Sequence, residues 1–282
     1  MTACLAALCN ASCVKESAGR TAAEDKEKST DSEIIFDAGG LGIDVETKAT
    51  VVNIDNLPEF NVIAATGSDG AETVAWSTVA RKVLGYRFST GKYWPAVNPN
   101  YHFYASNSDI VMESGSPKVT ADVSSNKDII VASSKTPSFP AQLIPLSFIH
   151  LFSKLGEVTI SSDKGYTLTD ISLRLVNAKT GGKWNLNTSS WDESAYTVDP
   201  SLPIAVGNND ILVVPGAVRV EATLKMNKGD YSSEFTFGAN VQLVQGKVCN
   251  LELNVPQDPA VPIALNVTIA DWQSTKLPLT LQ

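Results

Sequence analysis

Apolar residues alternate with polar or small residues in many short stretches of the chain. In 248–255 and 263–269 an apolar side chain recurs at every second position, which is the pattern of a strand with one buried face. Glycine, asparagine and aspartate gather between such stretches, for example at 207–210 and 227–230, where they favour turns. Many short strands joined by turns predict an all-β fold of the sandwich type. The alternation is also present at 32–36, 60–64, 128–132, 157–160, 169–176 and 218–226.

One stretch has a different period. Residues 146–155 carry apolar side chains at positions 148, 149, 151, 152 and 155, a spacing that predicts a short helix. Several prolines precede it, and they favour an extended connection. We therefore expect a linker near 136–145 and one short helix at the junction of two β-sandwich domains, 33–142 and 143–282, each of a size that fits one sandwich.

The N-terminal residues carry a different signal. Three of the four cysteines, Cys4, Cys9 and Cys13, lie in a short apolar segment of small residues, and the charged, polar stretch 14–32 follows. This order is typical of a bacterial lipoprotein export signal. It predicts a leader over 1–13, lipidation at Cys13 and a polar tether over 14–32. The apolar run is short and has no basic start, so either the start codon lies upstream of the one given or Cys13 is processed atypically. A frayed N-terminus without an export role is the alternative.

Composition narrows the class of protein. Of the 282 residues, 43 % are hydrophobic and 18 % charged, which is typical of a globular chain. The net charge is −8 and no Lys/Arg cluster is present, which argues against nucleic-acid binding and against an electrostatic membrane patch. Beyond the leader only Cys249 remains, so we expect no internal disulfide.

Candidate catalytic residues are few. The chain has two histidines, and no Cys/His cluster has the spacing of zinc ligands. Alternation places His102 on the same strand face as Tyr104, so a packed or hydrogen-bonded role is its preferred interpretation. His150 lies in the predicted short helix, where it would cap the helix or pack at the domain junction. The segment 67–72 could offer oxygens to calcium, but it lacks the alternation of an EF-hand loop and is more simply a turn. The sequence therefore predicts no enzyme, no cofactor and no metal site.

Aromatic residues are concentrated between Tyr86 and Tyr104. Among them, Trp94 and Tyr101 are flanked by asparagines and could form a platform for a sugar ring, because aromatic faces stack on the apolar side of a pyranose. The alternative is that these rings fill the core of the first domain.

The same segment resembles a known family. The stretches 89–96 (STGKYWPA) and 101–105 (YHFYA) are similar to those of fimbrillin-like proteins, the subunits of type V pili in Gram-negative anaerobes. Further pieces agree in order along the chain: 34–36, 46–50, 60–63, 145–155 and 267–272. The resemblance covers most of the chain after the leader.

The resemblance implies two transthyretin-like β-sandwich domains, lipoprotein export to the outer membrane and assembly into a fimbrium at the cell surface. In this family a protease removes the N-terminal segment with the first strand, which leaves a hydrophobic groove. A strand from a neighbouring subunit then fills this groove. Such β-augmentation takes its affinity from main-chain hydrogen bonds and its register from alternate side chains in pockets.

Particular residues match this mechanism. The first strand would be 33–37, and the cut would fall within 45–49, where Lys48 is the only basic residue. No arginine lies between Arg20 and Arg81, so a lysine-tolerant protease or no cleavage at all are the alternatives. For the donor strand, Leu277, Leu279 and Leu281 alternate in the tail 275–282. Pro278 counts against it, and a tail that folds back within its own domain is the other interpretation.

The sequence thus predicts a fimbrium subunit or fimbria-associated adhesin without catalytic activity. Its partners would be other fimbrial subunits, in a homopolymer or heteropolymer, and a ligand on a host or bacterial surface. It would contact the membrane only through a lipid anchor. The alternative function is a non-polymerising surface lipoprotein that binds carbohydrate.

Overall fold

The computed structural model describes residues 29–39, 54, 56–135, 137–162, 165–256, 258 and 261–272. Within these ranges the protein is built from strands, with two 3-10 helices of three residues each, η1 (Val123–Ser125) and η2 (Glu193–Ala195). The predicted all-β class is confirmed. Neither of these helices is long and apolar enough to cross a membrane.

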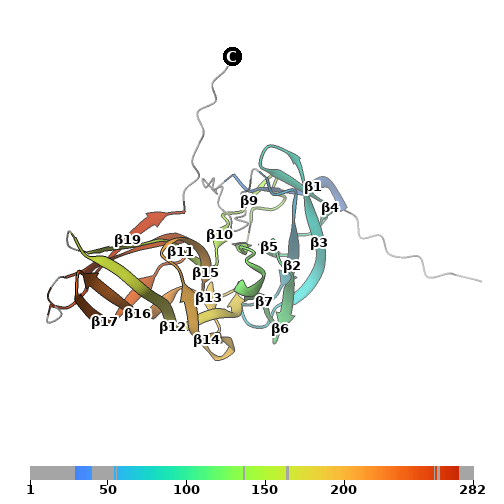
Figure 1. The fold of residues 1–282 in the computed structure, drawn as a ribbon. Coiled ribbons are helices and arrows are strands. Elements are labelled where there is room, and N and C mark those ends of the chain that lie inside the picture. Colours follow the sequence, from blue (N-terminus) through green and yellow to red (C-terminus); the bar gives the residue numbers. More distant parts are fainter. Residues whose placement is uncertain are drawn as a thin grey trace, which may run out of the picture.

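The first sheet has eight strands in the order β10-β8-β5-β2-β3-β4-β1-β9 (Figure 1). The two edge strands, β9 and β10, are joined by only three residues, so the sheet curls around one apolar core. The first strand predicted at 33–37 is confirmed, and it begins earlier, at Ser29. The strands are β1 (Ser29–Asp37), β2 (Glu59–Thr66), β3 (Thr73–Leu84), β4 (Arg87–Pro95), β5 (His102–Ser106), β8 (Ile130–Lys135), β9 (Ile144–Pro145) and β10 (Ile149–His150).

The short helix predicted within 146–155 is wrong. This stretch is extended and contains β10 and the start of β11 (Ser153–Ser162). Leu146, Phe148 and His150 alternate toward the interior, and 151–156 are buried at every position. The apolar residues of this stretch have a helical spacing because position 150 is buried but polar and because 151–156 are covered on both sides. In a short apolar run, spacing alone cannot distinguish a helix from a buried strand.

Two further sheets, built mostly from strands of the second half, pack around another apolar core (Figure 1). One sheet has the order β15-β11-β18-β19, and the other has the order β17-β16-β12-β7-β6 with β13 and β14 paired to β12. In β18, Leu251 and Leu253 point into the core while Glu252 between them is exposed, as the alternation predicts. The remaining strands are β6 (Ile110–Glu113), β7 (Ser116–Asp122), β12 (Thr167–Asn185), β13 (Ser190–Trp191), β14 (Thr197–Ile204), β15 (Gly207–Val213), β16 (Gly216–Lys228), β17 (Tyr231–Leu243), β18 (Lys247–Val255) and β19 (Ala264–Asp271).

Strands from both halves share a sheet. β7, from the first half, pairs with β12, and Ala121 lies opposite Gly182. The domain limits 33–142 and 143–282 and the transthyretin-like form of each domain remain predictions, and this pairing crosses the expected limit.

A third apolar cluster joins the halves. Ile63 and Tyr104, on the face of the first sheet opposite its own core, pack in one cluster with Trp184, Leu186 and Trp272. The central strands β2, β5 and β8 are therefore covered on both faces. This explains why all five residues of β5 are buried.

Candidate functional site

The first strand lies in a slot between two strands that do not follow it in sequence. On one side β1 runs antiparallel to β4, with Phe36 opposite Phe88. On the other side it runs parallel to β9, with Phe36 beside Ile144. Both edges of β1 are therefore occupied by the main chain of other strands.

Two side chains of β1 reach the centre of the first core. Ile34 and Phe36 have no exposed surface. The Phe36 ring meets the Phe103 ring edge-on, with 5.3 Å between centroids, and lies tilted against Phe60 at 6.2 Å. Full burial of such side chains contributes about 1.5–3 kcal/mol each. β1 is thus an integral part of the core, although it belongs to a separate segment near the N-terminus.

Hydrogen bonds outside the regular ladder also hold β1. The Thr90 hydroxyl donates to the carbonyl oxygen of Ile34 over 2.8 Å. The Leu146 amide donates to the carbonyl oxygen of Asp37, also over 2.8 Å. If β1 were absent, these donors and the edges of β4 and β9 would need a replacement strand, since buried unpaired donors are costly.

Several sequence-predicted residues lie outside the described part of the chain. These are Cys13, the expected lipidation site, and Lys48, the expected processing site, together with the donor-strand residues Leu277, Leu279 and Leu281. The expectations for them remain predictions.

The proposed sugar platform at Trp94 is wrong. Trp94 is 1 % exposed, and its indole N–H donates to the carbonyl oxygen of Ala141 over 3.0 Å. Tyr101 is half-buried and stacks on Trp94, with 6.0 Å between ring centroids. Both rings pack with the first apolar core. The alternative that the sequence left open, in which these aromatics fill the core, is the one observed for Trp94.

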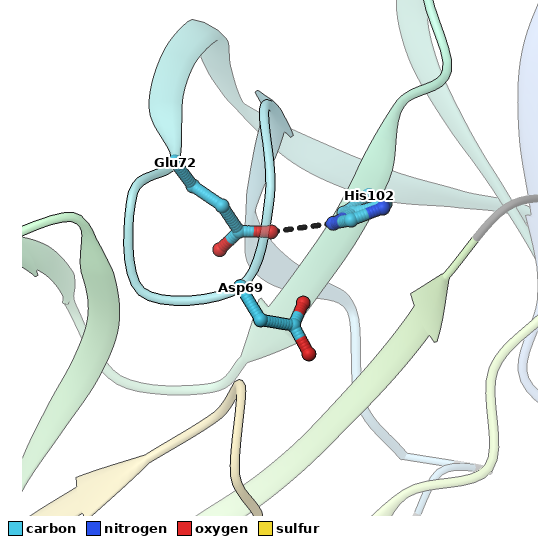
Figure 2. Close-up of side chains that lie close together, drawn as sticks. All are labelled: Asp69, Glu72 and His102. Atoms are coloured by element: carbon cyan, nitrogen blue, oxygen red, sulfur yellow. Dashed lines mark hydrogen bonds and ion pairs between the residues drawn. The ribbon is translucent and has the colours of Figure 1, made fainter.

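A polar cluster lies where the first sheet meets the second half, and it brings together residues that are distant in sequence (Figure 2). His102 and Tyr104 share one face of β5, as predicted, and both contact the buried carboxylate of Glu72. The distances to Glu72 Oε1 are 2.5 Å from His102 Nδ1 and 2.7 Å from the Tyr104 hydroxyl. Asp69 completes the group from the same turn as Glu72.

Burial and charge shape the chemistry of this cluster. Burial raises the pKa of Tyr104 far above its usual range, and the hydrogen bond to Glu72 adds to the effect, so its hydroxyl is a permanent donor. The Lys135 ammonium, 2.8 Å from Asp69 Oδ2, lowers the pKa of Asp69. The sequence drew attention to the turn at 67–72 and to His102 separately. It could not predict that they meet, because nothing local connects them.

The second histidine is also held by a carboxylate. His150 Nδ1 lies 2.6 Å from Asp128 Oδ2, and both side chains are buried. The imidazole stacks on the indole of Trp272, with 4.6 Å between ring centroids. His150 therefore packs as predicted, but from strand β10 and not from a helix, and its hydrogen bond to Asp128 was not predicted.

The chain is similar in sequence to a known family and in fold to several solved structures. A family model described as fimbrillin-like matches residues 47–272. A candidate cell adhesion protein from Parabacteroides distasonis has a similar structure at 9 % identity, with a TM-score of 0.60 over 87 % of this chain and 98 % of that one. Another from Bacteroides uniformis is similar at 15 % identity, with a TM-score of 0.51 over 87 % of this chain and 100 % of that one. A search of curated proteins finds no match. The chain belongs to the fimbrillin-like family.

Proposed function

We propose that this protein is a subunit or adhesin of a cell-surface fimbrium and that it joins its neighbours by exchanging β-strands. Membership of the fimbrillin-like family supports a place in a fimbrium and association with other fimbrial subunits. The observation that carries the strand exchange is the position of β1. β1 precedes the segment matched by the family model, yet it has two fully buried side chains and is hydrogen-bonded along both edges.

In this proposal, cleavage near Lys48 detaches β1 from the rest of the chain. Its departure opens the edges of β4 and β9 and empties the positions of Ile34 and Phe36. A strand from a neighbouring subunit then restores the main-chain hydrogen bonds and places apolar side chains at the same alternate positions. Cys13 would hold the uncut subunit at the outer membrane through a lipid.

The tail is the proposed donor. Leu277, Leu279 and Leu281 would supply three apolar side chains, worth roughly 5–9 kcal/mol gross when fully buried. Ile34 and Phe36 supply about 3–6 kcal/mol by the same measure. The donor can therefore replace β1 on energetic grounds if Pro278 faces away from the ladder.

A two-step experiment tests the exchange. A specific protease site is inserted between Gly39 and Ile54, and the purified chain is cut there. A synthetic peptide of residues 273–282 is then added, and release of the β1 fragment is followed by native mass spectrometry. We expect the peptide to displace the fragment and to bind in a one-to-one complex.

Matched peptides serve as controls. A peptide with Leu279→Asp should fail to displace β1, whereas Thr280→Asp should still do so, because alternate side chains point to opposite faces of a strand. If neither the native peptide nor the Thr280→Asp peptide displaces β1, this tail is not the donor. If the cut chain also stays monomeric when all of its β1 has been removed, the polymerising role is refuted.

A further inference from the structure

We propose that Asp69, Glu72 and His102 form a binding site for a divalent transition-metal ion, and that Zn²⁺ is the cation that suits them best. One ligand atom from each residue lies within 4.8 Å of the other two. Figure 2 shows the two carboxyl groups and the imidazole gathered around one small space. This site is independent of the strand exchange proposed above.

The types of ligand select the metal. One imidazole nitrogen and two carboxylate oxygens form a set that Zn²⁺ accepts, with a fourth position left for water. Ca²⁺ and Mg²⁺ prefer sites made of oxygen alone. The nitrogen of His102 therefore favours a borderline transition metal over the hard cations.

A second observation concerns the buried carboxylate of Glu72. Glu72 is 3 % exposed, and although its Oε1 receives two hydrogen bonds, its Oε2 is buried without any partner. A buried carboxylate oxygen without a donor is destabilising, since it has lost its water and gained nothing in return. Oε2 points away from His102 in Figure 2, so an ion held between His102 and Asp69 would bind the carboxylate through Oε1.

Lys135 is the competing cation. Its ammonium contacts Asp69 and also the side-chain oxygen of Asn187. To bind, a metal ion must displace this ammonium from Asp69. The ion must also break the hydrogen bond between His102 and Glu72 and bind both side chains itself. Lys135 keeps about a third of its side chain in solvent (32 % exposed), so it can turn outward.

The site has an entrance and a rigid frame. The Asp69 side chain is 62 % exposed, which leaves the cluster open to solvent on that side. On the other side the turn at 67–72 rests on the β6–β7 turn, where the Glu72 amide donates to the carbonyl oxygen of Gly115 over 3.0 Å. A Cβ at Gly115 would lie 2.7 Å from the carbonyl oxygen of Gly70, so only glycine allows this contact. A bound ion would tie the turn to β5 at the junction of the two halves.

Metal binding is measured with Zn²⁺ alone by calorimetry, and with Co²⁺ alone by visible absorption. The full chain is used after chelator treatment, with Cys4→Ser, Cys9→Ser and Cys13→Ser so that the leader thiols cannot bind the metal. We expect one ion per chain, a Co²⁺ spectrum of low coordination number and a higher Tm with Zn²⁺, because a ligand that binds only the folded state stabilises it.

Single variants decide whether the cluster is the site. Asp69→Asn, at an exposed side chain, should weaken Zn²⁺ binding by at least about tenfold, and His102→Gln should abolish the Co²⁺ spectrum. Lys135→Gln should bind Zn²⁺ more tightly, which a purely structural lysine would not produce. Asp230→Asn, in an exposed turn, is the matched control and should change nothing. No saturable binding, or binding unchanged by Asp69→Asn, overturns the proposal, and the Asp69 result stands even if His102→Gln fails to fold.

Discussion

Replacing Phe36 tests whether β1 is held in its slot by core packing. The substitution Phe36→Ala removes a ring that has no exposed surface and that contacts Phe60 and Phe103. It leaves the main-chain ladders to β4 and β9 in place. Ile35→Ala is the matched control, because this neighbour lies on the opposite face of the same strand and is only half-buried.

The expected cost follows from burial. Truncation of a buried phenylalanine to alanine costs about 3–5 kcal/mol, made up of lost transfer energy and the cavity that remains. The free energy of unfolding of the uncut chain should fall by this amount. Ile35→Ala should cost clearly less. In a chain cut between Gly39 and Ile54, the same loss weakens the binding of the β1 fragment by about two to four orders of magnitude, since each 1.4 kcal/mol is tenfold.

Urea unfolding of the uncut variants measures the first effect, and native mass spectrometry of the cut variants measures the release of β1. After the fragment has been removed, the Phe36→Ala and wild-type proteins should behave identically, because the altered residue has gone with it. Equal destabilisation by Phe36→Ala and Ile35→Ala, or release of β1 at the wild-type rate, would refute the reasoning that alternate side chains anchor this strand.

Three other side chains give shorter tests. Trp94→Phe should lower the free energy of unfolding, since it loses packing and the hydrogen bond to Ala141; glycan binding that depends on an exposed Trp94 ring would contradict this. Trp272→Ala should cost about 3–5 kcal/mol and speed hydrogen exchange in β10, whose His150 stacks on this ring, whereas unchanged exchange would show that the ring does not hold this strand. Burial raises the pKa of Cys249 to about 11, so at pH 8 only about one thiol in a thousand is ionised. Iodoacetamide should therefore alkylate Cys249 only after denaturation. Because the pKa of this thiol is higher in the folded chain than in the unfolded one, its contribution to stability is present below the ordinary thiol pKa and is lost as the pH rises toward 11. Rapid alkylation of the folded protein would show that Cys249 is accessible.

Local patterns in the sequence were enough to find most strands. The alternation in 248–255 and 263–269 predicted β18 and β19, and the short apolar run near Ile34 predicted β1. Side-chain period in a strand depends only on the local backbone, so it can be read without knowing the neighbours. The shared face of His102 and Tyr104 was found for the same reason.

Burial by distant parts of the chain could not be read in this way. The stretch 146–155 looked helical because its second half is covered on both sides, and nothing local records which elements will cover it. Trp94 looked available to a ligand because the segment that contains Ala141, which closes over it, lies more than forty residues further along the chain.

The sequence by itself determined the all-β class, the position of β1 and the fimbrillin-like resemblance, because alternation and short motifs are local properties. Only the tertiary structure decided that β7 pairs with β12 and that Glu72 lies against His102. These contacts join residues about 30 to 60 positions apart. The pairing of β2 with β5 in one sheet brings Glu72 close to His102. Packing of the two halves against each other accounts for the pairing of β7 with β12. The cost of closing such long loops is repaid only by the completed core, so no segment contains the information alone.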